Sequence, residues 1–492
     1  MNKSSALHPD CRYVYFVSVH RPFLTIVFIV LLSSLAPAES TSSSLPAGTI
    51  IPKVVCGADN KQSYALYLPS NFSAARPWPI IYVFDPAARG QMAVETIRAA
   101  AEKFGYIVAA SNNSHNGAMG DSAQAAKAMW QDTQQRFPVA EQRRYLAGMS
   151  GGARVATSIA LACHNCAAGV IANAAGFPLG SEPRPEMKFA YYAAVGNADF
   201  NYAEFVDLRR QLDEAGTRYH IRIFDGQHGW APPEVWMEAL NWMDIQAMSA
   251  GTLPRDDLRI QQTLASELAS AREFQSKNDP LAALRQYQSV VRDLRGLADV
   301  SAAETAVAEL SKSKAVKVAE KEEASALAQQ VQMTSGLYTQ LQAIAGDREK
   351  VDVGALKSSI IDLKKRATDS RNSNDLKALV AWRALGGLVV AAYEGGQRSL
   401  EEKNYRAALA YFDLAAAGSA NPAWAHYQRA RAYAMLTDRK NTLAELKTSL
   451  AGGFHESSAL DAAEFQTFRG QPEFQALAAE WKVAADKEKA QP

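Results

Sequence analysis

The sequence predicts an α/β domain with a mainly parallel sheet, followed by an all-α region that contains helical repeats. Two observations lead to this prediction. From about residue 48 to residue 250, short runs of β-branched and aromatic residues alternate with helical stretches, which is typical of a parallel sheet covered by helices. After about residue 252, glycine and β-branched runs become rare while alanine, leucine, glutamate and lysine increase, which indicates helices throughout.

The elements of the first region can be placed in chain order. Two runs, at residues 49–55 and 64–69, are expected to form a hairpin at the start of the domain. Together with the elements that follow, they predict one compact sheet with helices on both faces. The further strands are predicted at 79–84, 106–110, 145–149, 169–174, 189–195 and 220–224, and the helices at 91–104, 119–136, 151–162, 202–215 and 233–248.

Length and charge limit what the chain can be. At 492 residues with 48% hydrophobic residues, it is too long for one core and is expected to hold two or three units of roughly 100 to 250 residues. We place these units at 48–250, 255–370 and 380–485. Lysine and arginine number 52 against 51 aspartates and glutamates, so there is no basic surface of the kind that nucleic acid binding requires.

The N-terminus has the features of an export signal. Positive charges at Lys3, Arg12 and Arg21 precede an apolar run at residues 23–35, and a small-x-small sequence ends at Ala38. The run is shorter than the roughly 20 residues that a spanning helix needs, so no stable membrane span is expected. We predict a signal peptide at 1–38, cleavage after Ala38 and a secreted or periplasmic protein. An uncleaved N-terminal anchor is the alternative.

The cysteines favour a structural role. Cleavage would remove Cys11 and leave Cys56, Cys163 and Cys166. The last two form a C-x-x-C motif that could serve redox chemistry or metal binding, but no second pair completes a zinc site. In an oxidising compartment we favour a local disulfide between Cys163 and Cys166, or the pairing of Cys56 with one of them.

The helical region contains a repeated spacing. After similar turns at Lys277 and Lys403, a small residue is followed by an aromatic residue four positions later and by a small or branched residue three positions after that. This spacing resembles the second helix of a tetratricopeptide repeat. A further unit at 424–450 follows at close to the repeat's period of roughly 34 residues, whereas the unit within 255–370 is degenerate. Stacked helix pairs form concave surfaces, so we expect these helices to bind a protein partner or to shape access to a site.

The most informative motif is Gly148-x-Ser150-x-Gly152, which directly follows the predicted strand at 145–149. A serine held on a sharp strand-to-helix turn needs small neighbours so that its hydroxyl stands clear of the backbone. Because such a triplet occurs by chance in about one chain in ten of this length, its context must carry the interpretation.

That context is an acid and a base in a suitable order. A serine nucleophile requires a histidine base and a carboxylate that orients it, and on this kind of turn the order along the chain is Ser, acid, His. Asp199 ends the loop after the strand at 189–195, and His228 lies on a glycine-flanked turn after the strand at 220–224. Ligands of open parallel sheets bind at this carboxyl edge.

Two rivals fit less well. Asp225 lies on the same turn as His228, from which reaching the far ring nitrogen is awkward. His115 precedes the serine and so breaks the expected order. Together with the neighbouring Asn112, Asn113 and Asn116, it is interpreted as a substrate contact or a turn residue.

With these motifs, residues 48–250 resemble a small α/β-hydrolase of the esterase group that includes dienelactone hydrolases, carboxylesterases and polyhydroxybutyrate depolymerases. The resemblance covers about two fifths of the chain. It implies Ser150 as nucleophile, His228 as general base and acid, Asp199 as the orienting acid, and the backbone N–H of Gly151 as one oxyanion donor. The implied activity is hydrolysis of carboxylic esters, with no metal or cofactor.

The second oxyanion donor is less plain. Relatives often carry His-Gly after the strand that ends here at Phe84, whereas this chain has Asp85-Pro86-Ala87. Pro86 has no N–H, so Ala87 is the predicted donor. Asp85 would touch substrate or position the loop, although an Asp-Pro turn that caps the next helix is the more frequent explanation.

Two other functions fit the same residues. The hydrolase-like domain could be an inactive scaffold joined to a repeat-based interaction module, because fold does not imply activity. A peptidase is the other alternative, since the same triad hydrolyses amides.

Overall fold

A computed structural model describes residues 45–489, except residues 164, 347–350, 370–374 and 457. The predicted signal peptide, Cys11 and the expected cleavage after Ala38 lie outside the described residues. The chain from Pro46 onward forms one compact unit.

In the described part of the chain, eight strands form a single sheet in the order β1-β2-β4-β3-β5-β6-β7-β8. The first two strands form the predicted hairpin and run antiparallel to their neighbours, while the pairs from β3 to β8 are parallel. The predicted fold class is confirmed. The sheet has the strand arrangement of an α/β-hydrolase, and an all-α region follows it in the chain. The strands are β1 (Ile50–Val55), β2 (Ser63–Tyr67), β3 (Trp78–Phe84), β4 (Ile107–Ser111), β5 (Val139–Met149), β6 (Gly169–Asn173), β7 (Ala190–Gly196) and β8 (Tyr219–Phe224).

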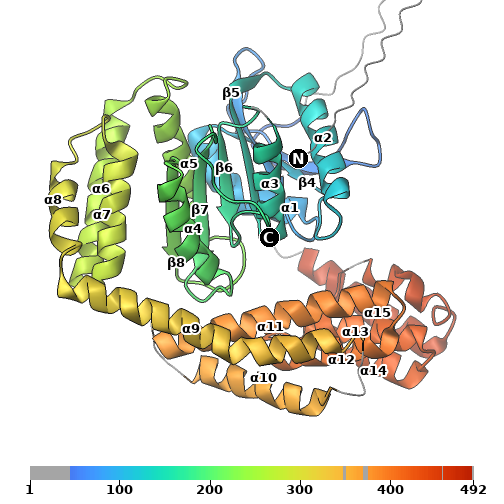
Figure 1. Ribbon diagram of the computed structural model, residues 1–492. Helices are drawn as coiled ribbons and strands as arrows, with labels where there is room; N and C mark the ends of the chain where they lie inside the picture. Colours follow the sequence, from blue (N-terminus) through green and yellow to red (C-terminus); the bar gives the residue numbers. More distant parts are fainter. Residues whose placement is uncertain (1–44, 164, 347–350, 370–374, 457, 490–492) are drawn as a thin grey trace, which may run out of the picture. The chain divides into compact units, whose positions relative to one another are not determined.

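Helices cover both faces of the sheet (Figure 1). Successive strand residues point to opposite faces. In β7, the Tyr191 hydroxyl therefore meets Thr157 of α3, whereas the Tyr192 hydroxyl donates to Glu238 of α5. The apolar faces of α1 and α5 share one core with alternate strand residues. The helices are α1 (Gly90–Phe104), α2 (Met119–Arg136), α3 (Gly151–Ala162), α4 (Tyr202–Glu214) and α5 (Pro233–Ser249).

Strand β5 is longer than its sequence suggested. The strand predicted at 145–149 is only its buried half, and pairing with β3 starts already at Val139, opposite Trp78. Residues 140–144 are polar or small and largely not buried. Because these residues show no hydrophobic alternation, the hydrophobic pattern could not reveal the extension.

Helices make up the rest of the described chain, here named the helical region. One of its hydrophobic cores lies between α9, α10, α11 and α12, another joins α6, α7 and α8 to α5, and a third lies between α13, α14 and α15. The helices are α6 (Asp257–Ser276), α7 (Pro280–Leu294), α8 (Ser301–Leu310), α9 (Lys314–Ala343), α10 (Val353–Thr368), α11 (Leu376–Glu401), α12 (Tyr405–Gly418), α13 (Ala423–Met435), α14 (Arg439–Ala451) and α15 (Pro472–Lys489), with 3-10 turns η2 (Ala459–Asp461) and η3 (Ala463–Phe465).

Three turns in the helical region have the same backbone form. In each, a residue with positive φ is followed by an aspartate or asparagine whose side chain accepts from the amide three residues further on, as helix caps do. The tetratricopeptide-like nature of these units stays a prediction. The turn pairs are Asn278 and Asp279, Lys403 and Asn404, and Thr437 and Asp438.

Of the described helices, α11 alone is long and apolar enough to cross a membrane. However, 56% of its apolar window is buried within the protein, against neighbours that include α10 and α12. Such burial is what the central helix of a folded region shows.

The cysteines settle one alternative. Cys163 and Cys166 form a disulfide directly after α3, so the local pairing is found and Cys56 is left as a buried free thiol. Burial, together with the charges of Asp132 and Asp59, raises the pKa of Cys56 to about 11. At neutral pH this thiol is therefore protonated and a poor nucleophile.

Candidate active site

Ser150 occupies a strained turn between β5 and α3. Its φ is 53° and its ψ is −122°, a conformation that residues with a Cβ rarely adopt. Its amide donates to the carbonyl of Asn173 at 2.8 Å, and its own carbonyl accepts from Ala153 at 3.0 Å. The turn is thus held from both sides, as expected for a nucleophile elbow.

The glycines of the motif are required by close backbone packing. A Cβ on Gly148 would lie 2.3 Å from the carbonyl oxygen of Gly152, and one on Gly152 would lie 2.0 Å from the carbonyl oxygen of Phe84. Because backbone atoms cannot rotate away, a side chain on Gly148 would push the start of α3 away from β5, and one on Gly152 would push the elbow off the end of β3. The positions therefore tolerate glycine alone.

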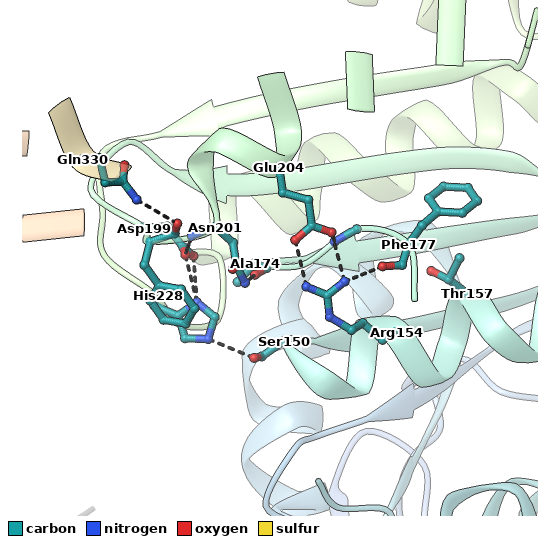
Figure 2. Close-up of polar contacts among 12 residues, drawn as sticks. Ser150, Arg154, Thr157, Ala174, Phe177, Asp199, Asn201, Glu204, His228 and Gln330 are labelled. Carbon is teal, nitrogen blue, oxygen red and sulfur yellow. Dashed lines mark hydrogen bonds and ion pairs between the residues drawn. The ribbon is translucent and has the colours of Figure 1, made fainter. Parts of the chain in front are cut away.

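Ser150, His228 and Asp199 lie in hydrogen-bond contact (Figure 2). The Nε2 atom of His228 is 2.9 Å from the hydroxyl of Ser150, and its Nδ1 atom is 2.9 Å and 3.0 Å from the two carboxylate oxygens of Asp199. Asp199 is fully buried and also accepts from the amide of Asn201 at 2.8 Å. Both ring nitrogens of His228 are engaged, which leaves no place for Asp225 as the orienting acid.

An ion pair braces the helices that follow Ser150 and Asp199. Arg154 of α3 makes a bidentate contact with Glu204 of α4, at 3.0 and 2.8 Å, and also donates to the carbonyl of Phe177 (Figure 2). Glu204 accepts from the amide of Gly176 as well, at 2.9 Å. Bidentate geometry fixes direction as well as distance, so α3 and α4 keep a defined relation.

The structure argues against Ala87 as second oxyanion donor. Its amide donates to the carboxylate of Asp85 at 2.8 Å. The short side chain of Asp85 turns forward onto its own backbone. The prediction for Ala87 therefore needs correction, and the alternative that Asp85 positions the loop fits the contacts.

Asp85 is a buried hub of that loop. Its carboxylate accepts from Arg89 at 2.9 Å on each oxygen and from the indole N–H of Trp230 at 2.9 Å. Burial would raise the pKa of Asp85, but the hydrogen bonds and charge of Arg89 and the donors Trp230 and Ala87 together lower it below its usual value. Since Trp230 lies two residues after His228, Asp85 ties the loop after β3 to the loop that carries the histidine.

Gly151 and Asn116 form the side of the site opposite Asp199. Gly151 is the first residue of α3, where amides have no intrahelical acceptor, so its predicted role as donor stands as a prediction. A Cβ on Gly151 would lie 1.8 Å from the side-chain oxygen of Asn116, which places the Asn116 amide directly against it. The Asn116 amide nitrogen is 3.4 Å from Glu394 of α11. His115 bonds back to the carbonyl of Asn113 at 2.9 Å, as a turn residue does.

Sequence reasoning missed the residues that the helical region brings to the site. Arg383 of α11 donates to the carbonyl of Asn197 at 2.7 Å. Gln330 of α9 donates to the carbonyl of Phe200 at 3.3 Å (Figure 2). Neither residue stands in a motif, and nothing in the local sequence could have indicated these contacts.

Comparison with known proteins gives partial similarity. No protein-family model and no curated protein matches the chain. Similar solved structures include the S-formylglutathione hydrolase FrmB from Staphylococcus aureus, with 17% identity, a TM-score of 0.31, and coverage of 37% of this chain and 90% of that one. The Staphylococcus aureus fluorophosphonate-binding serine hydrolase FphF has 13% identity, a TM-score of 0.33, and coverage of 40% and 98%. A ferulic acid esterase has 17% identity, a TM-score of 0.31, and coverage of 39% and 94%.

The class of the protein follows from the strand order and the elbow. A mainly parallel sheet with an antiparallel second strand, and a serine on a strained turn after β5, define an α/β-hydrolase fold.

Proposed function

We propose that this protein is an exported serine hydrolase that cleaves carboxylic esters through an acyl-enzyme intermediate. The observation that carries the proposal is the continuous relay from the Ser150 hydroxyl through both nitrogens of His228 to the buried Asp199. A buried carboxylate on Nδ1 holds the imidazole in the tautomer whose Nε2 accepts a proton.

The reaction follows from these positions. Ser150 attacks the ester carbonyl while His228 takes its proton, and Asp199 stabilises the resulting imidazolium. His228 then protonates the alcohol as it leaves. Water attacks the acyl-enzyme with His228 again as base, and the acid is released with Ser150 restored.

The oxyanion formed in each half-reaction needs two donors. The backbone N–H of Gly151 is one of them. For the second we propose the side-chain NH2 group of Asn116 in place of Ala87. Asn116 lies against Gly151, and its Nδ2 has a second hydrogen besides the one directed at Glu394, whereas the single N–H of Ala87 is engaged by Asp85.

Export rests on the N-terminal pattern and on one further observation. The Cys163–Cys166 disulfide is of a kind that persists in oxidising compartments. Fractionation of the producing cells, with the mass of the mature N-terminus, tests this. Export predicts a chain that starts after Ala38, and full-length protein in the cytoplasm would contradict it.

Covalent labelling is the most direct test of the nucleophile. A fluorophosphonate probe is expected to label the mature protein once, at Ser150, and short-chain nitrophenyl esters to be hydrolysed. Both activities should vanish in Ser150→Ala. Labelling that survives in this variant would reject Ser150, and folded wild-type protein that takes no label would favour the inactive scaffold. Peptide nitroanilides, run alongside, separate an esterase from a peptidase.

A further inference from the structure

Arg383 is a buried cation that the helical region directs at the loop carrying Asp199. This loop, residues 197–200, is here named the acid loop. Only 3% of Arg383 is exposed, its guanidinium carbon lies 3.6 Å from the ring centre of Tyr202, and its Nε atom donates to Asn197. Burial lowers the pKa of Arg383, and the nearby Tyr202, Glu323 and Asp199 partly offset this. An arginine remains charged under such conditions.

The residue that Arg383 holds is the point where the acid loop meets the loop of His228. The amide of Asn197 donates to the carbonyl of Phe224, and its side-chain oxygen accepts from the amide of Gly226 at 3.2 Å. The next amide, that of Ala198, donates to the carbonyl of Gly226 at 2.9 Å. Movement of Asn197 would therefore shift Asp199 and His228 relative to each other.

A second contact reaches His228 through Phe200. The ring of Phe200 lies 4.1 Å from the imidazole, centre to centre. On the α11 side, a Cβ on Gly387 would lie 3.3 Å from the Cβ of Phe200 and 2.2 Å from the hydroxyl of Tyr338, and one on Gly386 would lie 3.6 Å from the Phe200 ring. The two glycines thus let α11 lie close against Phe200.

A third contact holds the end of the acid loop. Tyr202, the first residue of α4, donates to Glu323 of α9 at 2.6 Å. Glu323 in turn accepts two hydrogen bonds from Arg285 of α7, at 2.9 and 2.6 Å. With Gln330 on Phe200, helices α9 and α11 contact the six-residue segment 197–202 at both ends and in its middle, and α7 holds Glu323 through Arg285.

We propose that the helical region is an integral part of the catalytic site, and that Arg383 is the positioning residue through which α11 fixes the acid loop and the Asp199–His228 pair. The proposal rests on the proposed hydrolase function. A region that served only to bind a partner would need no buried cation on this loop. If Arg383 holds the acid loop in position, its loss lowers kcat, because small displacements of the reacting groups slow the reaction. Substrate binding, measured as KM, should change little.

The experiment compares Arg383→Met with Arg383→Lys in the full mature chain. Methionine keeps an unbranched apolar stem but removes the charge and every donor, whereas lysine keeps the charge and one donor position. For nitrophenyl ester hydrolysis, normalised to sites labelled by fluorophosphonate, Arg383→Met is expected to lower kcat about 10- to 100-fold and to change KM less than about twofold. Arg383→Lys should recover part of the loss.

The matched control is Arg429→Met. Arg429 of α13 is also a largely buried arginine, with ion pairs to Asp413 and Glu445, but it lies away from the acid loop. We expect it to lower stability and to leave kcat per labelled site unchanged. Equal kcat in Arg383→Met and wild type, or an equal fall in Arg429→Met, would overturn the positioning role.

A second pair of variants covers the case in which Arg383→Met does not fold. Gly387→Ala must displace the Tyr338 hydroxyl or Phe200, and is expected to lower kcat severalfold. Gly336→Ala on α9 adds a methyl into open space and should have no effect. Equal kcat in both would overturn the proposal. A wild-type chain that takes no label would instead reject the proposed hydrolase function itself.

Discussion

At the residue scale, Asp85 is the side chain that ties two loops of the site together. Its buried carboxylate accepts hydrogen bonds from Ala87, Arg89 and Trp230. The aspartate thereby joins the loop after β3 to the turn that carries His228. Asp85 holds these two loops together. Because it also engages the Ala87 amide, we expect the oxyanion donors to be other groups.

We predict that Asp85→Asn destabilises the fold by about 2 kcal/mol, because an amide cannot pair with Arg89 and leaves buried donors unmatched. Urea unfolding measures the change. Glu141→Gln is the control, since that ion pair with Arg144 involves a carboxylate that is 81% exposed and contributes little. Equal free energies of unfolding for Asp85→Asn and wild type would refute the hub role.

Asn116 is the residue that we expect to complete the oxyanion site. Asn116→Ala should lower kcat about 100-fold, the usual effect of losing one donor, with little effect on stability because Asn116 is exposed. Asn112→Ala in the same loop is the control, since Asn112 bonds the carbonyl of Pro52. If both variants keep wild-type kcat, another donor must serve.

At the element scale, helix α11 spans the site. Arg383 contacts the acid loop, and eleven residues further along the helix Glu394 contacts Asn116 beside the elbow. One helix of the helical region therefore lies against both sides of the triad. The exposed carboxylate of Glu394 places a negative charge on the Asn116 side of the site.

We predict that this charge selects substrates. Glu394→Lys should lower kcat/KM for esters with a cationic group, and raise it for anionic ones, by about five- to tenfold at low salt. The ratio of kcat/KM for a matched pair of cationic and anionic nitrophenyl esters measures this. Glu401→Lys makes the same charge change at the exposed end of α11 and is expected to leave the ratio unchanged, so a similar shift in both variants would exclude a local effect.

At the scale of the whole molecule, a buried charged cluster joins the sheet to the helical region. His220 of β8 is 2.8 Å from Asp293 of α7 and 3.1 Å from Glu238 of α5. Burial alone would lower the pKa of His220, but hydrogen bonds and charge from Asp293 and Glu238 raise it to about 9. Around these groups lie Arg222 of β8, Tyr192 of β7 and Glu267 of α6, whose own pKa burial raises to about 7.

This cluster predicts a fall in stability at alkaline pH. The folded pKa of His220 lies above the unfolded value of about 6.5, so its contribution is complete below pH 6.5 and is lost as the pH rises through about 9. The raised pKa of Glu267 also lowers stability as the pH rises, but in a lower range, between its unfolded value of about 4.3 and about 7. We expect urea unfolding of wild type to lose a few kcal/mol, at most about 3, over the pH range of His220. His220→Gln should flatten the curve, whereas substitution of the exposed His115 should not, and parallel curves would refute the linkage.

Much of the fold was predictable because its signals are local. Strands β3 to β8 contain short apolar runs, most of them separated by helices, and the elbow, Asp199 and His228 each follow a recognisable strand. The start of β5 was not predictable, because residues 140–144 are polar or small and show no hydrophobic alternation. Ala87 was predicted as a donor from chain position, and a side chain two residues away captures its amide.

The sequence by itself determined the succession of strands and helices along the chain, the glycines around Ser150 and the chain order of its acid and base, because each depends on a few adjacent residues. Only the tertiary structure decided how the site is enclosed. Arg383 meets Asn197 across 186 residues and Glu394 meets Asn116 across 278. Such contacts arise from the packing of whole helices, and the sequence around each of the two residues in contact shows no periodicity or motif that indicates them.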